Sequence, residues 1–234
     1  SSAASDVYKR QIMDNNIHET IKDIKSKFRL FMNGMVSQSM REKGMEYKLN
    51  FGIEYPRIKE IAAGYEPDHE LAQALWKENI RECKILAGLL QPADTFYQEI
   101  ADIWIEGMDY PELAEYTVMN LFQRLPYASE VVFRWMADER EMFQLCGFLL
   151  MARLLMKGEK LNERAEAEFL DQACTAVEGD CGPVQKAASV ALRKYAHQSR
   201  DNKRTVSKQL GIWAKSEKPA VRALAEDIKA DLEF

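Results

Sequence analysis

Apolar residues recur at intervals of three and four along almost the whole chain, which is the spacing of amphipathic α-helices. No stretch shows the strict alternation of apolar and polar residues that marks a half-buried strand. Glycine (11 residues) and proline (7 residues) are scarce, and most of them fall between the periodic segments. The pattern therefore excludes a turn-dense all-β fold and predicts an all-α protein.

Glycine, proline and capping residues divide the pattern into about a dozen helices joined by short loops. Short loops make consecutive helices antiparallel neighbours, and helix pairs recur about every 30–45 residues, which is typical of a HEAT-like α-solenoid. A compact irregular helical bundle is the alternative. We expect helices over 14–40 (one helix or two), 56–63, 68–76, 80–90, 96–106, 109–125 with a capping box of Asp109 and Glu112, 128–137, 139–157, 161–177, 184–198, 201–214 and 219–232.

The first twelve residues differ in character from the rest of the chain. Ser1–Gln11 has no apolar stretch of the kind that a signal peptide contains, and Met13 follows almost at once. We therefore expect residues 1–12 to be a non-native or disordered leader. No low-complexity linker interrupts residues 13–234, which predicts a single HEAT-like domain over that range.

The longest apolar run, Met142–Met156, is too short for the roughly 20 residues of a membrane span and contains Gln144 and Arg153. It predicts a central core helix and no membrane partner. The four tryptophans, which also lie within apolar helical patterns, are expected in the core rather than at a base-stacking surface. They are Trp76, Trp104, Trp135 and Trp213.

The common signatures of metal, nucleotide and serine-hydrolase sites are absent. The three histidines are far apart, the four cysteines form no C-x-x-C pair, and there is no glycine-rich phosphate loop or G-x-S-x-G. The sequence therefore predicts no metal and no cofactor. Cysteines within apolar patterns are typical of free thiols in a reducing cytoplasm, which is the expected location.

Charge is distributed unevenly along a chain whose formal net charge is −5. Pro92–Gly182 contains 7 basic and 18 acidic residues, whereas Pro183–Arg222 contains 10 basic and 2 acidic residues. A local net charge of +8 indicates either a surface that contacts a phosphate backbone or a solvated basic face that balances an acidic one.

One helix carries this basic block on a defined face. At about 100° per residue, the helix that begins near Val184 turns its alanines, Leu192 and Tyr195 to one side, and its basic residues to the other. Val190 lies in the middle of the basic side. The candidate DNA-binding residues are Lys186, Val190, Arg193 and Lys194, with Lys203, Arg204 and Lys208 of the next helix as second contributors.

Three stretches, in this order, resemble motifs of the DNA alkylation repair family, which comprises the HEAT-like-repeat DNA glycosylases and their relatives. They are FGIEYPRIKEIA (51–62), LAQALWKENIRECKILAGLL (71–90) and VQKAASVALRKYA (184–196), and the resemblance extends over about residues 48–215. It implies a solenoid with a concave basic surface that grips double-stranded DNA through its backbone. It also implies excision of N3- or N7-alkylated purines, with a carboxylate that stabilises the sugar and aromatic faces against the cationic base.

The chain differs from the catalytic members of this family at the positions that form their chemical centre. Val190 occupies the place of a tryptophan, and Pro111 and Glu115 occupy the places of a tryptophan and an aspartate. The arginine of the active pattern is missing near Gln144 and Leu145. Glu115 is thus the candidate catalytic residue, the alternative being a surface carboxylate or salt-bridge partner.

The sequence leaves two functional hypotheses open. The first is a DNA-binding member of the family, which either excises alkylated purines through Glu115 or recognises unusual DNA without cutting it. The second is a non-catalytic HEAT-like scaffold for a protein partner, which the acidic middle of the chain favours. The sequence gives no indication of oligomeric state.

Overall fold

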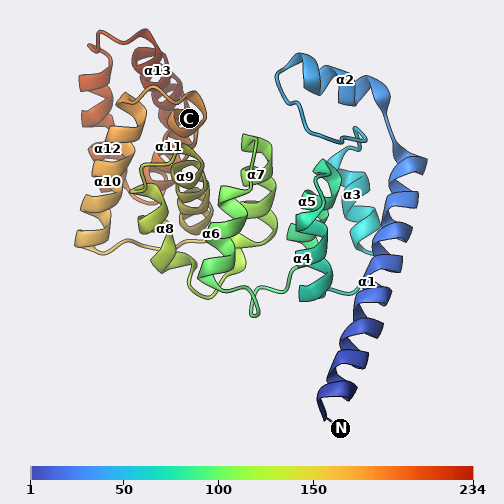
Figure 1. The fold of residues 1–234 in the computed structure, drawn as a ribbon. Helices are drawn as coiled ribbons and strands as arrows, with labels where there is room; N and C mark the ends of the chain where they lie inside the picture. The colour runs from blue at the N-terminus through green and yellow to red at the C-terminus, as the bar shows by residue number, and fades with distance from the viewer. Residues whose placement is uncertain (1, 234) are drawn as a thin grey trace. The chain divides into compact units, whose positions relative to one another are not determined.

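The computed structural model describes residues 2–233, which form thirteen α-helices and one 3₁₀ turn (Figure 1). The only extended pairing among them is an isolated bridge between Leu49 and Ile80. The all-α prediction is confirmed. The chain groups into two compact units, Ser1–Tyr97 and Gln98–Phe234, called here the N-terminal and the C-terminal unit. The expectation of a single domain over 13–234 stays a prediction.

In the N-terminal unit, α5 packs against α3 and α4, and α1 packs against both of these helices. The α1 residues that enter this core are Ile21, Ile24 and Phe28. Asn33 separates α1 from α2, because its side chain accepts hydrogen bonds from the backbone N–H groups of Met35 and Val36. The helices are α1 (Ser2–Phe31), α2 (Gly34–Glu42), α3 (Tyr55–Ala62), α4 (His69–Lys77) and α5 (Arg81–Leu90).

The predicted leader coincides with the first turns of α1. Residues 2–12 are helical, and their side chains are exposed. The non-native or disordered leader expected over residues 1–12, of which Ser1 lies outside the described residues, stays a prediction.

A buried carboxylate fixes the loop before α3. Glu82 is fully buried and accepts hydrogen bonds from the backbone N–H groups of Phe51 (3.1 Å) and Ile53 (3.3 Å). Arg81 donates to Glu82 at 3.1 Å and to the carbonyl of Ile53 at 3.0 Å. Gly52 has a φ of +68°, and a Cβ there would lie 2.2 Å from the carbonyl oxygen of Asn33. These hydrogen bonds therefore join the first two family-like motifs, residues 51–62 and residues 71–90.

The C-terminal unit has two layers of helices (Figure 1). In the central layer, α7 contacts α9, α9 contacts α11, and α11 contacts α13; in the covering layer, α8 packs on α9, α10 on α11, and α12 on both α11 and α13. Its elements are α6 (Gln98–Glu106), α7 (Pro111–Asn120), η1 (Phe122–Arg124), α8 (Ala128–Met136), α9 (Glu141–Met156), α10 (Glu163–Glu178), α11 (Gly182–Ala196), α12 (Arg200–Trp213) and α13 (Pro219–Glu233).

The apolar run 142–156 forms α9, the helix at the centre of this unit, as predicted. Ten of its sixteen residues are buried. Gly147 lets α8 approach closely, because a Cβ at this position would lie 2.5 Å from the backbone nitrogen of Met136. Every helix in the described part of the chain is too short or too polar to cross a membrane.

The start and the end of α7 differ from the prediction. The capping box of Asp109 and Glu112 is wrong: Pro111 is the first helical residue, so Tyr110 is the N-cap, and it makes no side-chain capping bond. The helix also ends at Asn120 rather than Leu125, because Leu121 leaves helical geometry with a φ of −126° before η1 begins.

Candidate functional site

A cavity of about 390 Å³ opens in the C-terminal unit where α7, α9 and α11 meet. Glu115 of α7 and Lys186 of α11 are its only charged lining residues. Its remaining walls are almost wholly aliphatic, and they consist of Pro111, Leu145, Leu149, Gly182, Pro183, Ala187 and Val190. The structure thus brings together three residues that the sequence singles out, namely Glu115, Lys186 and Val190.

Glu115 keeps its proton more readily than an ordinary glutamate. Partial burial among the apolar walls raises its pKa, and the nearby charge of Glu112 raises it further. No described residue donates a hydrogen bond to Glu115 or pairs with it, so the salt-bridge alternative has no partner in residues 2–233. A carboxyl group in this setting can exchange protons with a ligand in the cavity.

The basic residues of α11 continue from the cavity along one side of the helix. Lys186 is exposed, Val190 is 37% exposed, and Arg193 and Lys194 are half-buried. Their positions are four, seven and eight residues after Lys186, so they share one face, called here the α11 face. The opposite side of α11 is buried, as the helical periodicity predicts.

The cations of the α11 face have no acidic partner among the described residues. Lys186 and Lys194 make no ion pair, and Arg193 makes one side-chain bond, from Nη2 to the hydroxyl of Ser189 at 3.1 Å. The Nε of Arg193 is buried and has no hydrogen-bond acceptor. A buried donor without an acceptor is uncommon, and an ordered water can satisfy it.

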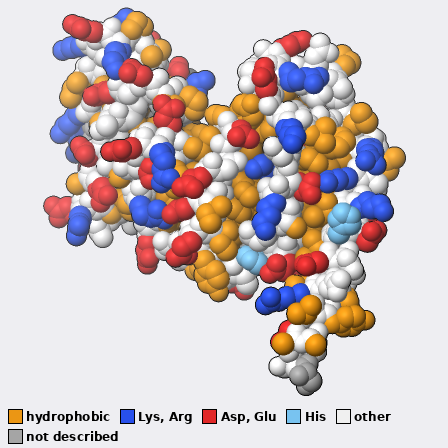
Figure 2. Space-filling view, in the orientation of Figure 1, with side chains coloured by type: hydrophobic (Ala, Val, Ile, Leu, Met, Phe, Trp, Pro, Cys, Tyr) orange, Lys and Arg blue, Asp and Glu red, His pale blue; other side chains and the backbone are white. Residues whose placement is uncertain are grey.

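Some other cations of the same unit are paired with acidic residues. Ion pairs of 2.7 to 3.2 Å join Arg134 to Asp102, Arg140 to Glu106 and Asp138, Arg204 to Asp201, and Lys218 to Asp180. On the side of this unit that Figure 2 shows, red and blue side chains are accordingly interspersed rather than separated. The unpaired state of the α11 cations therefore sets them apart from these arginines and lysines.

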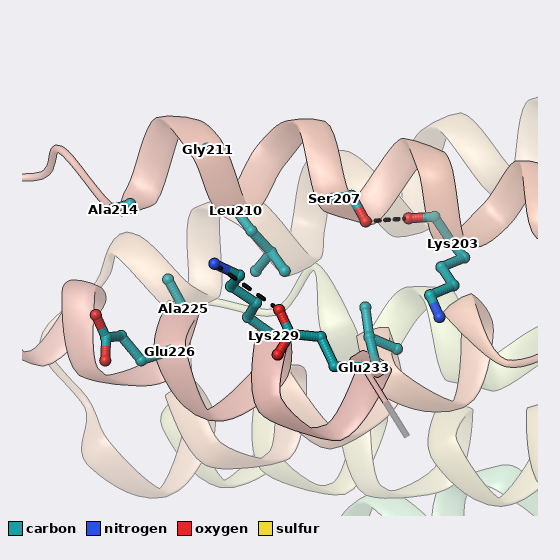
Figure 3. A pocket seen from close by; sticks show the side chains of 10 residues that line it. Lys203, Ser207, Leu210, Gly211, Ala214, Ala225, Glu226, Lys229 and Glu233 are labelled. Carbon is teal, nitrogen blue, oxygen red and sulfur yellow. Dashed lines mark hydrogen bonds and ion pairs between the residues drawn. The ribbon is translucent and has the colours of Figure 1, made fainter.

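The second group of predicted contacts lies on another layer. Lys203, Arg204 and Lys208 are exposed residues of α12, which belongs to the covering layer. Lys203 lines a separate cavity of about 410 Å³ between α12 and α13, where Glu233 pairs with Lys229 (Figure 3). None of the three lines the cavity of Glu115, and their role in DNA binding stays a prediction.

The site has no aromatic wall. All four tryptophans are buried, with exposed fractions from 0 to 7%, which confirms that they belong to the core. Val190, at the position of the family's tryptophan, lines the cavity from the exposed side of α11. The structure therefore combines a carboxyl group and a cationic face but offers no ring against which a cationic base could pack.

Sequence reasoning reached the α9 side of this site only at Leu145, near which it noted the missing arginine of the active pattern. Leu145 and Leu149 line the cavity, and Arg153 follows at the same four-residue spacing, half-buried and without an acidic partner in the described chain. The four-residue spacing is present in the sequence. However, apolar residues occupy every turn of 142–156, so the spacing alone did not distinguish the side of α9 that lines the cavity. In residues 2–233, no group of three or more His, Cys, Asp or Glu side chains is placed to hold a metal ion.

Comparisons with known proteins agree with this architecture. Residues 24–206 match the family model described as DNA alkylation repair enzyme. A solved structure with a TM-score of 0.75 and 16% sequence identity covers 91% of this chain and 96% of its own. It is described as belonging to a new family of proteins related to the HEAT-like repeat DNA glycosylases with affinity for branched DNA structures. No curated protein shows significant sequence similarity to the chain.

Proposed function

The chain belongs to the DNA alkylation repair family, with a HEAT-like helical fold, and on this premise we propose that it binds double-stranded DNA through the phosphate backbone. The contacts come from the α11 face, with Lys186 at the cavity and Arg193 and Lys194 further along the helix. The observation that carries the proposal is that these three cations share one face of α11 and have no acidic partner in residues 2–233, whereas Arg134 and Arg140 of the same unit are paired.

The spacing of the α11 face suits a polyanion. Lys186 and Lys194 are separated by about 12 Å along the helix axis, at 1.5 Å per residue, so they can reach different phosphates. Arg193, one residue before Lys194, adds a planar guanidinium to this face. Phosphate contacts of this kind fix the position of a protein on DNA and carry no base specificity.

The similar solved structure suggests which kind of DNA to test. Its description names affinity for branched DNA, and a branch consists of duplex arms that a backbone-binding face can grip. We therefore extend the proposal to the arms of branched DNA. A cytoplasmic location, expected from the free cysteines, stays a prediction.

Fluorescence anisotropy with a labelled duplex and a labelled four-way junction tests the proposal. The double variant Lys186→Ala, Arg193→Ala is expected to bind both DNAs at least tenfold more weakly than the wild type. Lys160→Ala with Lys215→Ala is the matched control, because it removes two exposed lysines outside α11. Circular dichroism verifies that each variant is folded. Unchanged affinity of the α11 variant would contradict the proposal and favour the protein-binding scaffold.

The Glu115 cavity favours a second candidate function, which is excision of N3- or N7-alkylated purines. These bases carry a positive charge and are good leaving groups, so the protein has to stabilise the developing sugar cation and position a water. A carboxylate at Glu115 can do both, whereas the aliphatic walls provide no cation–π contact to the base. We therefore expect slow excision that depends on Glu115.

A further inference from the structure

We propose that the Glu115 cavity acts on abasic sites in DNA, with Lys186 as an amine nucleophile that opens the strand by β-elimination. The inference rests on the proposed DNA binding and adds a separate activity to it. It begins from the composition of the cavity, in which one amine and one carboxyl group are the only charged groups on aliphatic walls.

Lys186 has the chemistry that an abasic site requires. The deoxyribose of such a site has an aldehyde at C1′ in its open-chain form, and lysine amines attack carbonyl carbons to form imines. An arginine could not do so, because its guanidinium stays protonated. Lys186 forms no ion pair with a described residue, so no salt bridge has to break before it reacts.

Glu115 supplies the second group that the reaction needs. It lines the cavity from α7 and Lys186 lines it from α11, so the two groups can reach a bound sugar from different helices. Its raised pKa, caused by burial and by Glu112, makes it a better proton acceptor than an ordinary glutamate once it is ionised. The carboxylate is therefore placed to act on a carbon next to the imine.

The walls match a sugar better than a base. A pocket for a flipped base is typically lined with rings on which the base stacks. Here the walls are Leu145, Leu149, Ala187 and Val190, with two prolines. Aliphatic side chains can pack against the carbons of a deoxyribose. The lining residues include no aromatic ring on which a base would stack.

The reaction balances without a cofactor. The Lys186 ammonium group first gives a proton to solvent, and the neutral amine then adds to C1′ while water leaves, which gives an imine. Glu115 removes a proton from C2′, the electron pair forms the C2′–C3′ double bond, and the C3′–O bond breaks with its electrons on the leaving phosphate. Water then hydrolyses the imine, which frees the amine and an unsaturated aldehyde on the upstream strand. The proton on Glu115 returns to solvent.

Borohydride trapping tests this inference, because borohydride reduces the imine to a stable amine and so links the protein to the DNA. The probe is a duplex with one abasic site, and each variant is used at a concentration that saturates the DNA. The wild type is expected to form the cross-link, with the modified peptide mapping to Lys186. Lys186→Arg is expected to give less than a tenth of the cross-link, whereas Lys160→Arg gives the full amount.

Strand scission without borohydride separates the roles of the two groups. Glu115→Gln is expected to form the cross-link but to cut the strand at least tenfold more slowly, because the imine forms and the C2′ proton is not removed. A wild type that binds the abasic duplex but gives no cross-link, or a cross-link that persists in Lys186→Arg, would overturn the inference alone. A wild type that binds no DNA would overturn the proposed function as well.

Discussion

Glu115 of α7 and Lys186 of α11 line the same cavity, although α8, α9 and α10 lie between them in the chain. The central layer brings them together because α7, α9 and α11 meet at this cavity. A carboxyl group with a raised pKa thereby lies beside the start of a cationic helix face.

Glu82→Ala should strongly destabilise the protein. The change removes a fully buried acceptor from Arg81 and from the N–H groups of Phe51 and Ile53, and breaking a buried ion pair costs about 3–5 kcal/mol. Urea unfolding measures the loss. Glu78→Ala is the control, since Glu78 forms a half-exposed pair with Lys25 that is worth at most about 1 kcal/mol. Equal losses in the two variants would contradict the role of Glu82.

The glycines of α9 and α12 should respond oppositely to substitution by alanine. At Gly147, the new Cβ would overlap with the backbone of Met136, so we expect a loss of about 1–3 kcal/mol. At Gly211, no atom lies within 4 Å of the new Cβ, so the better helix propensity of alanine should stabilise by up to about 1 kcal/mol. Urea midpoints of the two variants measure both effects, and a tolerated Gly147→Ala would show that α8 and α9 can separate.

Asp138→Asn should lower stability at pH 7 but not in strong acid. The hydrogen bond from the Arg140 side chain lowers the pKa of Asp138 to about 2. This pair therefore stabilises the folded state above the usual aspartate pKa of about 3.9, and the contribution is lost as the pH falls towards 2. Because Arg140 is half-exposed, the expected difference at pH 7 is about 1 kcal/mol.

Chemical unfolding of both proteins from pH 2.5 to pH 7 measures this difference. Asp201→Asn is the matched control, because it removes an aspartate from an ion pair with Arg204 in which both side chains are largely exposed. A difference between wild type and Asp138→Asn that stays constant over this range would contradict the assignment.

Glu115→Gln should reduce the release of methylated purines from alkylated DNA. General acid–base or electrostatic groups contribute about 10²–10⁴ in rate, so the variant should be at least tenfold slower than the wild type. Chromatography of the released bases measures it, with Glu168→Gln on the surface of α10 as the control. If the wild type and Glu115→Gln release equal amounts, Glu115 has no part in excision.

The helices were predictable because each one buries a continuous apolar stripe. The core position of α9 followed from Met142–Met156, and the buried side of α11 followed from its alanines and Tyr195. The start of α7 was not predictable from Asp109, because Pro111 competes with that capping box and determines the first helical residue. A capping box and a proline both indicate where a helix starts, and the sequence alone does not show which of the two determines the first helical residue.

The site was predictable only in part, for a related reason. Lys186, Arg193 and Lys194 share a face that one helix alone determines, so periodicity found them. Their relation to Glu115 depends on the packing of α7 and α9 against α11, which no local pattern contains. The same limit applies to α12, whose basic residues are close to α11 in sequence but lie in the other layer.

The salt dependence of DNA binding tests the central claim most directly. Each phosphate contact contributes about 0.9 to the slope of log K against log salt concentration. We predict that Lys186→Ala with Lys194→Ala reduces this slope by about 2 and weakens binding to a duplex, whereas Lys160→Ala with Lys215→Ala leaves the slope within about 0.5 of the wild type. An unchanged slope in the α11 variant, or an equal reduction in both variants, would contradict a phosphate-binding face on α11.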